Sequence, residues 1–107
     1  KTATVQSFDI RALKELHSQA PDLQLAFLIE NADSFESNMA RLDFVPAIYS
    51  PYYLLVNKEL VKQCHEKNMK LVPWTVNDVK SMRRLVRLGV DGVITDYPDK
   101  IREVSGK

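Results

Sequence analysis

Four carboxylate side chains stand where this sequence predicts the ends of strands or the loops after them. They are Asp9, Glu30, Asp78 and Asp96. Carboxylates are ligands that Mg²⁺ and Ca²⁺ take in proteins, so a metal cluster is one interpretation of the four. Helix capping is the better interpretation of Asp9 and Asp78, because each precedes a predicted helix, while Asp96 fits a turn. Glu30 has no obvious capping role.

The two histidines and the single cysteine lie inside predicted helices rather than at strand ends. Catalytic groups of parallel α/β proteins come from strand ends and the loops after them. The sequence therefore predicts partly exposed, non-catalytic positions for His17 and His65. Cys64 falls in the apolar stripe of its helix, which is typical of a buried small hydrophobe. A lone cysteine excludes an internal disulfide and leaves the redox compartment open.

Two large aromatic side chains, Phe8 and Trp74, also stand at predicted strand ends. At that place an aromatic ring can wall a cleft and exclude water from a reacting group. Taken from the residues alone, Trp74 is more simply a core residue of the sheet. Tyr52 and Tyr53, like Tyr49, could reach the same edge, but the directions of their side chains are not readable from sequence.

A repeated strand–helix unit must position these side chains. β-Branched and apolar runs predict strands at residues 2–8, 23–29, 45–49, 71–76 and 90–95. Apolar residues at helical spacing predict helices at residues 10–20, 34–42, 58–67, 79–88 and from 98 to 104. We expect Asn68 and Gly89 to close two of these helices in the left-handed conformation. Pro51 is expected in a loop, because proline cannot extend a central strand.

The alternation of strands and helices predicts a parallel sheet with helices packed against it. Two architectures fit: an open doubly wound sheet, or consecutive units of a (β/α)8 barrel. In both, the carboxyl ends of the strands converge on one face, where ligands bind. At 107 residues the chain has room for one domain.

Charge and hydropathy exclude some classes of partner as the principal one. The formal net charge is +1, and the densest basic group is Arg83, Arg84 and Arg87, which is typical of a solvated helix face. We therefore expect neither nucleic acid nor an anionic membrane as the main partner. No apolar run approaches the roughly 20 residues of a membrane span, and no signal-peptide pattern opens the chain. The compartment is left open, whether cytoplasmic, periplasmic or secreted.

Two motifs bring the sequence close to a known family. Residues 74–77, Trp-Thr-Val-Asn, precede residues 89–98, Gly-Val-Asp-Gly-Val-Ile-Thr-Asp-Tyr-Pro, by about a dozen positions. Together they resemble the C-terminal part of glycerophosphodiester phosphodiesterases. Residues 5–9, Val-Gln-Ser-Phe-Asp, and residues 49–51, Tyr-Ser-Pro, are similar to earlier strand ends of that family. The resemblance covers essentially the whole chain. One departure is Asn68, where the family more often has glycine.

The resemblance implies a (β/α)8 barrel that hydrolyses glycerophosphodiesters to an alcohol and glycerol 3-phosphate, with a divalent metal such as Mg²⁺ or Ca²⁺. This chain would supply about five βα units, the C-terminal portion of the barrel. The resemblance places Phe8 and Trp74 on the apolar wall of the substrate pocket. The family's His-Arg motif, Glu-x-Asp pair, second catalytic histidine and later metal glutamate belong to its first three units. None of these motifs occurs here.

We therefore expect a single partial domain over residues 1–107, inactive alone, with its catalytic and metal-binding groups in a missing N-terminal half. Two alternatives stay open: a stand-alone doubly wound binding module, and a non-catalytic barrel remnant. The outer strands, around Val5 and Ile94, would leave apolar edges uncovered in a fragment. Self-association through those edges is a further expectation.

Overall fold

The computed structural model describes residues 4–97, 99 and 100 of this chain. Its centre is a four-stranded parallel sheet whose strands follow one another in chain order. The strands are β1 (Thr4–Ser7), β2 (Gln24–Ile29), β3 (Ile48–Pro51) and β4 (Lys70–Leu71). A doubly wound sheet reverses direction at a switch point, so that strands next to each other in the chain are separated there. The uninterrupted order is that of consecutive barrel units, and the doubly wound alternative is wrong.

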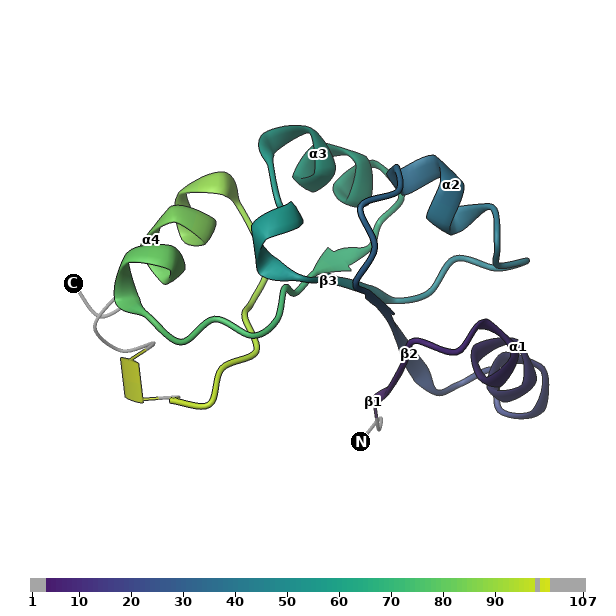
Figure 1. Ribbon diagram of the computed structural model, residues 1–107. Coiled ribbons are helices and arrows are strands. Elements are labelled where there is room, and N and C mark those ends of the chain that lie inside the picture. Colours follow the sequence, from purple (N-terminus) through teal and green to yellow (C-terminus); the bar gives the residue numbers. More distant parts are fainter. Residues whose placement is uncertain (1–3, 98, 101–107) are drawn as a thin grey trace.

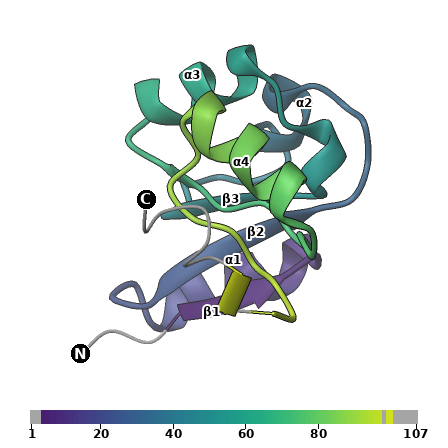
Figure 2. The same cartoon turned by 90° about the vertical axis from the view of Figure 1, so that its left-hand side faces the viewer.

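Four helices and one short turn connect the strands. They are α1 (Ile10–Gln19), α2 (Phe35–Met39), the 3₁₀ turn η1 (Tyr53–Leu55), α3 (Lys58–Glu66) and α4 (Val79–Leu88). Figure 1 shows the four helices as an arc around the strands, from α1 to α4. The view in Figure 2 shows the same sheet beneath α2, α3 and α4. The arrangement is that of part of a barrel, with helices on the outside.

Short polar side chains start the helices, as the sequence predicts. Asp9 accepts a hydrogen bond from the Arg11 backbone N–H at 2.9 Å, and Asp78 accepts one from the Ser81 backbone at 2.8 Å. Ser34 and Asn57 cap α2 and α3 in the same way. These bonds satisfy N–H groups that a helix start leaves free.

The predicted helix ends are also confirmed. Asn68 has a φ of 61° and Gly89 a φ of 100°, both in the left-handed region. Asparagine tolerates this conformation better than most residues because its short amide side chain can bond locally. The final helix expected from residue 98 lies outside the described residues, apart from Asp99 and Lys100, which are helical.

The third strand corrects two expectations. It covers Ile48–Pro51 rather than residues 45–49, so Pro51 is the last residue of a strand that has neighbours on both sides. Pro51 has no N–H, and by the alternation of a parallel ladder that N–H would bond the Val72 carbonyl. The Ser50 hydroxyl donates to this carbonyl instead, at 2.5 Å. A neighbouring side chain therefore replaces the missing backbone donor.

The last two expected strands are less regular than the sequence predicts. β4 is only Lys70–Leu71, because Pro51 supplies no N–H to the Val72 carbonyl, and pairing with β3 returns as the single bridge Tyr52–Trp74. Residues 90–95 form no regular strand, although they run beside β4. The Asp91 backbone donates to the Leu71 carbonyl and the Ile94 backbone to the Pro73 carbonyl, both at 2.9 Å. The two acceptors are two positions apart in the chain, whereas the two donors are three positions apart. The segment therefore has one extra residue relative to β4, as in a β-bulge.

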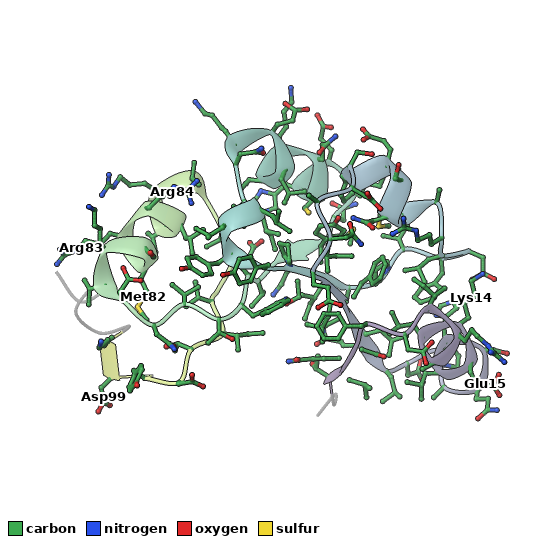
Figure 3. All side chains as sticks on the ribbon, in the orientation of Figure 1. Lys14, Glu15, Met82, Arg83, Arg84 and Asp99 are labelled. Carbon is green, nitrogen blue, oxygen red and sulfur yellow. The ribbon has the colours of Figure 1, made fainter. Side chains whose placement is uncertain are left out.

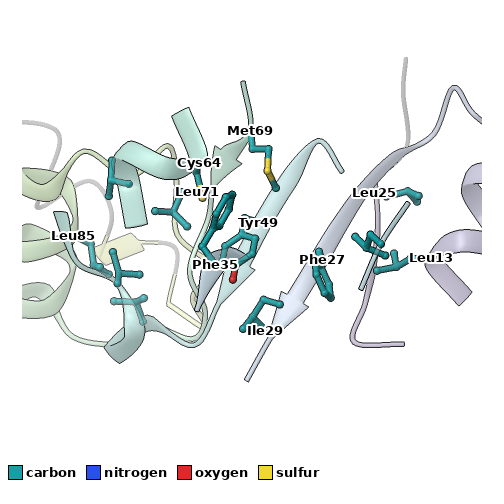
Figure 4. Packing of buried hydrophobic residues seen from close by; sticks show 14 of the residues in the cluster. Leu13, Leu25, Phe27, Ile29, Phe35, Tyr49, Cys64, Met69, Leu71 and Leu85 are labelled. Atoms are coloured by element: carbon teal, nitrogen blue, oxygen red, sulfur yellow. The ribbon is translucent and has the colours of Figure 1, made fainter. Parts of the chain in front are cut away.

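The main core lies between the sheet and the helices (Figure 4). Leu25, Phe27 and Ile29 alternate along β2 toward the helices, each 2% exposed. Phe27 and Phe35 both pack against Tyr49, with ring centroids 6.2 and 5.1 Å apart. The apolar run of β2 is thus buried as predicted, and it holds the strand ends in fixed positions.

Candidate functional site

Three aromatic rings gather at the carboxyl edge of the sheet. Phe8, which follows β1, contacts Trp74, which follows β4, edge to face, with centroids 5.7 Å apart and planes at 88°. Tyr52, directly after β3, contacts Trp74 from another side at 5.4 Å and 65°. β1 and β4 are the two outer strands of the sheet. The contact between Phe8 and Trp74 therefore requires strong curvature, as in a barrel wall.

The backbone and the indole nitrogen fix Trp74 in this cluster. Its indole N–H donates to the Ser50 carbonyl at 2.8 Å. Its backbone N–H donates to Pro51 at 3.0 Å, and its carbonyl accepts from Tyr53 at 2.7 Å. Trp74 is half-buried, whereas Phe8 and Tyr52 are exposed, at 48% and 37%. The result is one anchored ring with two open apolar rings beside it, a surface that can bind the carbon skeleton of a ligand.

The four carboxylates expected at strand ends do not come together. Asp9 and Asp78 are helix caps, and the hydrogen bond from the Ser81 backbone lowers the pKa of Asp78. Asp96 accepts from the Asn77 side-chain amide at 3.1 Å. Glu30 is exposed and lines a small pocket of about 110 Å³. Within residues 4–97, 99 and 100 no three histidine, cysteine or carboxylate side chains are placed to hold a metal ion.

The loops after β4 and after residues 90–95 are tied together through Asn77. Its side-chain oxygen accepts from the Asp96 backbone at 3.0 Å and from the Thr95 hydroxyl at 3.2 Å. Its backbone carbonyl accepts from the Lys100 ammonium group at 3.0 Å. Asn77 and Thr95, which stand in the two family-like motifs, therefore close this side of the carboxyl edge.

The histidines and the cysteine occupy helices, away from the aromatic cluster. His17 stacks on Phe44 with centroids 4.0 Å apart, and His65 Nε2 lies 2.9 Å from an Asp91 carboxylate oxygen. Cys64 is fully buried, and this burial, with a smaller contribution from Asp91, raises the pKa of its thiol to about 12. A thiol with that pKa is neutral and a weak nucleophile near pH 7.

The three tyrosines expected near the strand ends lie in different environments. Tyr49 is buried, its hydroxyl accepts from the Asn38 side chain at 3.0 Å, and burial raises its pKa to about 12. Tyr53 is partly buried and packs against the core. Only Tyr52 joins Phe8 and Trp74. Its position just past a strand-ending proline is the signal that could have found it, but period-two alternation cannot show the direction of a side chain beyond a strand.

A larger pocket, of about 330 Å³, lies on the helix side of the strand ends. Its floor includes Phe35 and Tyr49, and Asn31, Glu36 and Gln63 are among its polar lining residues. Gln63 of α3 bonds Glu36 of α2 at 2.8 Å, so side chains of two helices meet beside it. This pocket shares no lining residue with the aromatic cluster.

The fold and the strand-end cluster define a class: part of a (β/α)8 barrel, in which ligands bind at the carboxyl ends of the strands. Comparison with known proteins gives the family. The model of the glycerophosphoryl diester phosphodiesterase family matches residues 1–100. The chain belongs to this family.

The curated relatives are longer than this chain. A glycerophosphodiester phosphodiesterase of Caldanaerobacter subterraneus subsp. tengcongensis is 33% identical over 97 residues, which is 91% of this chain and 40% of that protein. One from Bacillus subtilis is 32% identical over 103 residues, or 94% of this chain and 35% of that protein. The chain therefore spans about two fifths of the length of the curated relatives it matches.

Solved structures show the same relation. A glycerophosphodiester phosphodiesterase from Parabacteroides distasonis superposes with a TM-score of 0.76 at 27% identity, covering 92% of this chain and 41% of that one. A phosphodiesterase from Oleispira antarctica, solved with its product sn-glycerol-3-phosphate, has a TM-score of 0.85 at 21% identity. It covers 99% of this chain and 42% of that one. The predicted C-terminal barrel portion is thus confirmed as a partial barrel.

Length and hydropathy of the helices bear on membrane insertion. Over residues 4–97, 99 and 100, no helix is both long and apolar enough to cross a bilayer.

Proposed function

We propose that this chain is the C-terminal part of a metal-dependent phosphodiesterase that hydrolyses glycerophosphodiesters to an alcohol and glycerol 3-phosphate. Membership of the family supports the reaction class, and relatives that share 32–33% identity carry the name of this activity. The observation that carries the proposal for this chain is the contact between Phe8 and Trp74 at the carboxyl edge. That edge is where barrel enzymes bind their substrates.

The rings would form the apolar wall of the substrate pocket. A glycerol unit presents C–H groups as well as hydroxyls, and aromatic faces accommodate C–H groups while excluding water. Exclusion of water strengthens electrostatic interactions with the phosphate. Trp74 is held by three hydrogen bonds, so it would present its ring without rearrangement. Phe8 would complete the wall from the far side of the curved sheet.

The acid–base groups and the metal ligands would come from residues outside this sequence. Phosphodiester hydrolysis needs an activated nucleophile, an acid for the leaving oxygen and neutralisation of phosphate charge. His17 and His65 lie on helices and contact Phe44 and Asp91 rather than the aromatic cluster. The described residues do not form a metal site, so a metal would be held by residues outside them.

The test is activity of the longer protein that contains this chain. We expect it to release glycerol 3-phosphate from glycerophosphocholine, measured by a coupled dehydrogenase assay, and residues 1–107 alone to release none. Trp74→Ala in the longer protein should lower kcat/KM by about tenfold or more, and Trp74→Phe should retain most of it. Full activity of the Trp74→Ala enzyme would refute the pocket role. Absence of diesterase activity in the longer protein would leave the non-catalytic barrel as the better proposal.

A further inference from the structure

Helix α4 carries four cations on one face. Lys80, Arg83, Arg84 and Arg87 recur at positions i, i+3, i+4 and i+7, which lie one above another on a helix. Residues Val79–Leu88 contain no acidic side chain. Figure 3 shows Arg83 extending away from the body of the protein. We call these four residues the basic stripe.

The part of the chain that the structure describes does not neutralise the basic stripe. The ion pairs among the described residues are Arg41–Asp33 and His65–Asp91, and neither involves α4. Like charges at i+3 and i+4 oppose helix formation, so the stripe weakens its own helix. A local arrangement that lowers stability without visible compensation is a signal of function. Arg84 also donates to the Val56 carbonyl at 3.0 Å, which holds its side chain against the segment after η1.

Exposed apolar side chains flank the basic stripe. Val86, on α4 itself, is 52% exposed. Leu54 of η1 is 64% exposed and lies two residues before Val56, the residue to which Arg84 is bonded. Cations beside exposed aliphatic groups are typical of surfaces that lie in the interfacial region of a bilayer.

We propose that the basic stripe, with Leu54 and Val86, binds the surface of an anionic lipid bilayer. The cations would meet head-group phosphates while the two aliphatic side chains enter the interface. This face belongs to the outer helical layer, so it stays on the surface when further barrel units complete the sheet. The proposal does not depend on the proposed phosphodiesterase activity.

A nucleic acid fits this surface less well. The stripe spans seven residue steps, or about 10 Å of helix, which is short for tracking a phosphate backbone. An exposed leucine and valine have no function against phosphates. They do have one at the boundary between head groups and acyl chains.

The test is sedimentation of the longer protein that contains this chain with large unilamellar vesicles at low salt. We expect binding to phosphatidylcholine vesicles that contain about 30% phosphatidylglycerol, and weak binding to phosphatidylcholine alone. Each Lys or Arg near such a surface contributes about fivefold, so Arg83→Gln with Arg87→Gln should weaken binding about 25-fold. Leu54→Ser should weaken it several-fold without any change in charge.

The matched control is Lys58→Gln with Lys62→Gln, which removes two exposed cations from α3. This variant should bind anionic vesicles within about twofold of the unchanged chain. Thermal unfolding should show that the α4 variant is at least as stable, because three of the four repulsive i+3 and i+4 pairs are relieved. The proposal is overturned by an equal loss in the control, by equal binding to both kinds of vesicle, or by no binding to either. Tighter binding to a DNA duplex at the same salt concentration also overturns it.

Discussion

Ser50→Ala is the substitution that most directly tests how this sheet holds a proline. Ser50 is 1% exposed, and its hydroxyl donates to the Val72 carbonyl, which has no backbone donor because Pro51 stands opposite. Removal of the hydroxyl leaves an unpaired acceptor inside the sheet. An unsatisfied buried polar group costs about 1–3 kcal/mol. The expected loss in the free energy of unfolding therefore lies in this range, with a fall in Tm of about 4–8 °C for each kcal/mol.

The measurement is urea unfolding followed by the fluorescence of Trp74, the single tryptophan of the chain. Its indole donates to the Ser50 carbonyl, so the probe lies beside the change. The midpoint should fall while the m-value stays the same, because the fold is retained. Ser18→Ala, on the solvent side of α1, is the matched control and should change stability by less than about 0.5 kcal/mol.

The decisive comparison adds Pro51→Ala, which restores a backbone N–H facing the Val72 carbonyl. In that background the cost of Ser50→Ala should fall below about 1 kcal/mol, because the acceptor again has a partner. The coupling between the two positions is the quantity that the structure predicts. An equal cost in both backgrounds would refute the idea that the hydroxyl replaces the missing N–H.

Three further outcomes follow from the same structure. Burial raises the pKa of the Cys64 thiol from 9.0 to about 12. Above pH 9 the folded state therefore keeps a proton that the unfolded state loses. The free energy of unfolding should then fall by up to about 1.4 kcal/mol per pH unit. Urea unfolding between pH 8 and 10 should show this fall, and Cys64→Ala should flatten it; an unchanged slope would contradict the linkage. Gly89→Ala should lower the free energy of unfolding by about 1–2 kcal/mol in the same assay, because φ at Gly89 is 100°. Gly92→Ala should cost less, because its new methyl group would meet Val72 only at ordinary contact distance. Equal costs would exclude backbone strain at Gly89 as the cause. The strand edges near Val5 and Ile94 have no pairing partner among the described residues, so we expect concentration-dependent self-association of residues 1–107 in sedimentation. A compact monomer at high concentration would contradict this expectation.

Local chemistry in the sequence determined most of the helices and their ends. Asp9, Asp78, Asn68 and Gly89 act at single positions through their own side chains or backbone freedom, so their roles are readable one residue at a time. The continuous apolar run of β2 also identified a strand buried in the sheet, because a run of that length is too short for a typical buried helix. The family-like motifs added the family and its barrel fold.

Tertiary structure decided what depends on partners distant in the chain. Pro51 belongs in a strand only because the Ser50 hydroxyl reaches Val72, 22 residues away. Residues 90–95 do not form a regular strand because their register against β4 slips around Pro73. Phe8 reaches Trp74 because curvature of the sheet brings the ends of its outer strands together. Tyr52 joins them because it pairs with Trp74, whereas Tyr49 packs against Phe35 of α2. Sequence patterns report the periodicity of single segments, whereas register and curvature arise only when the strands pair.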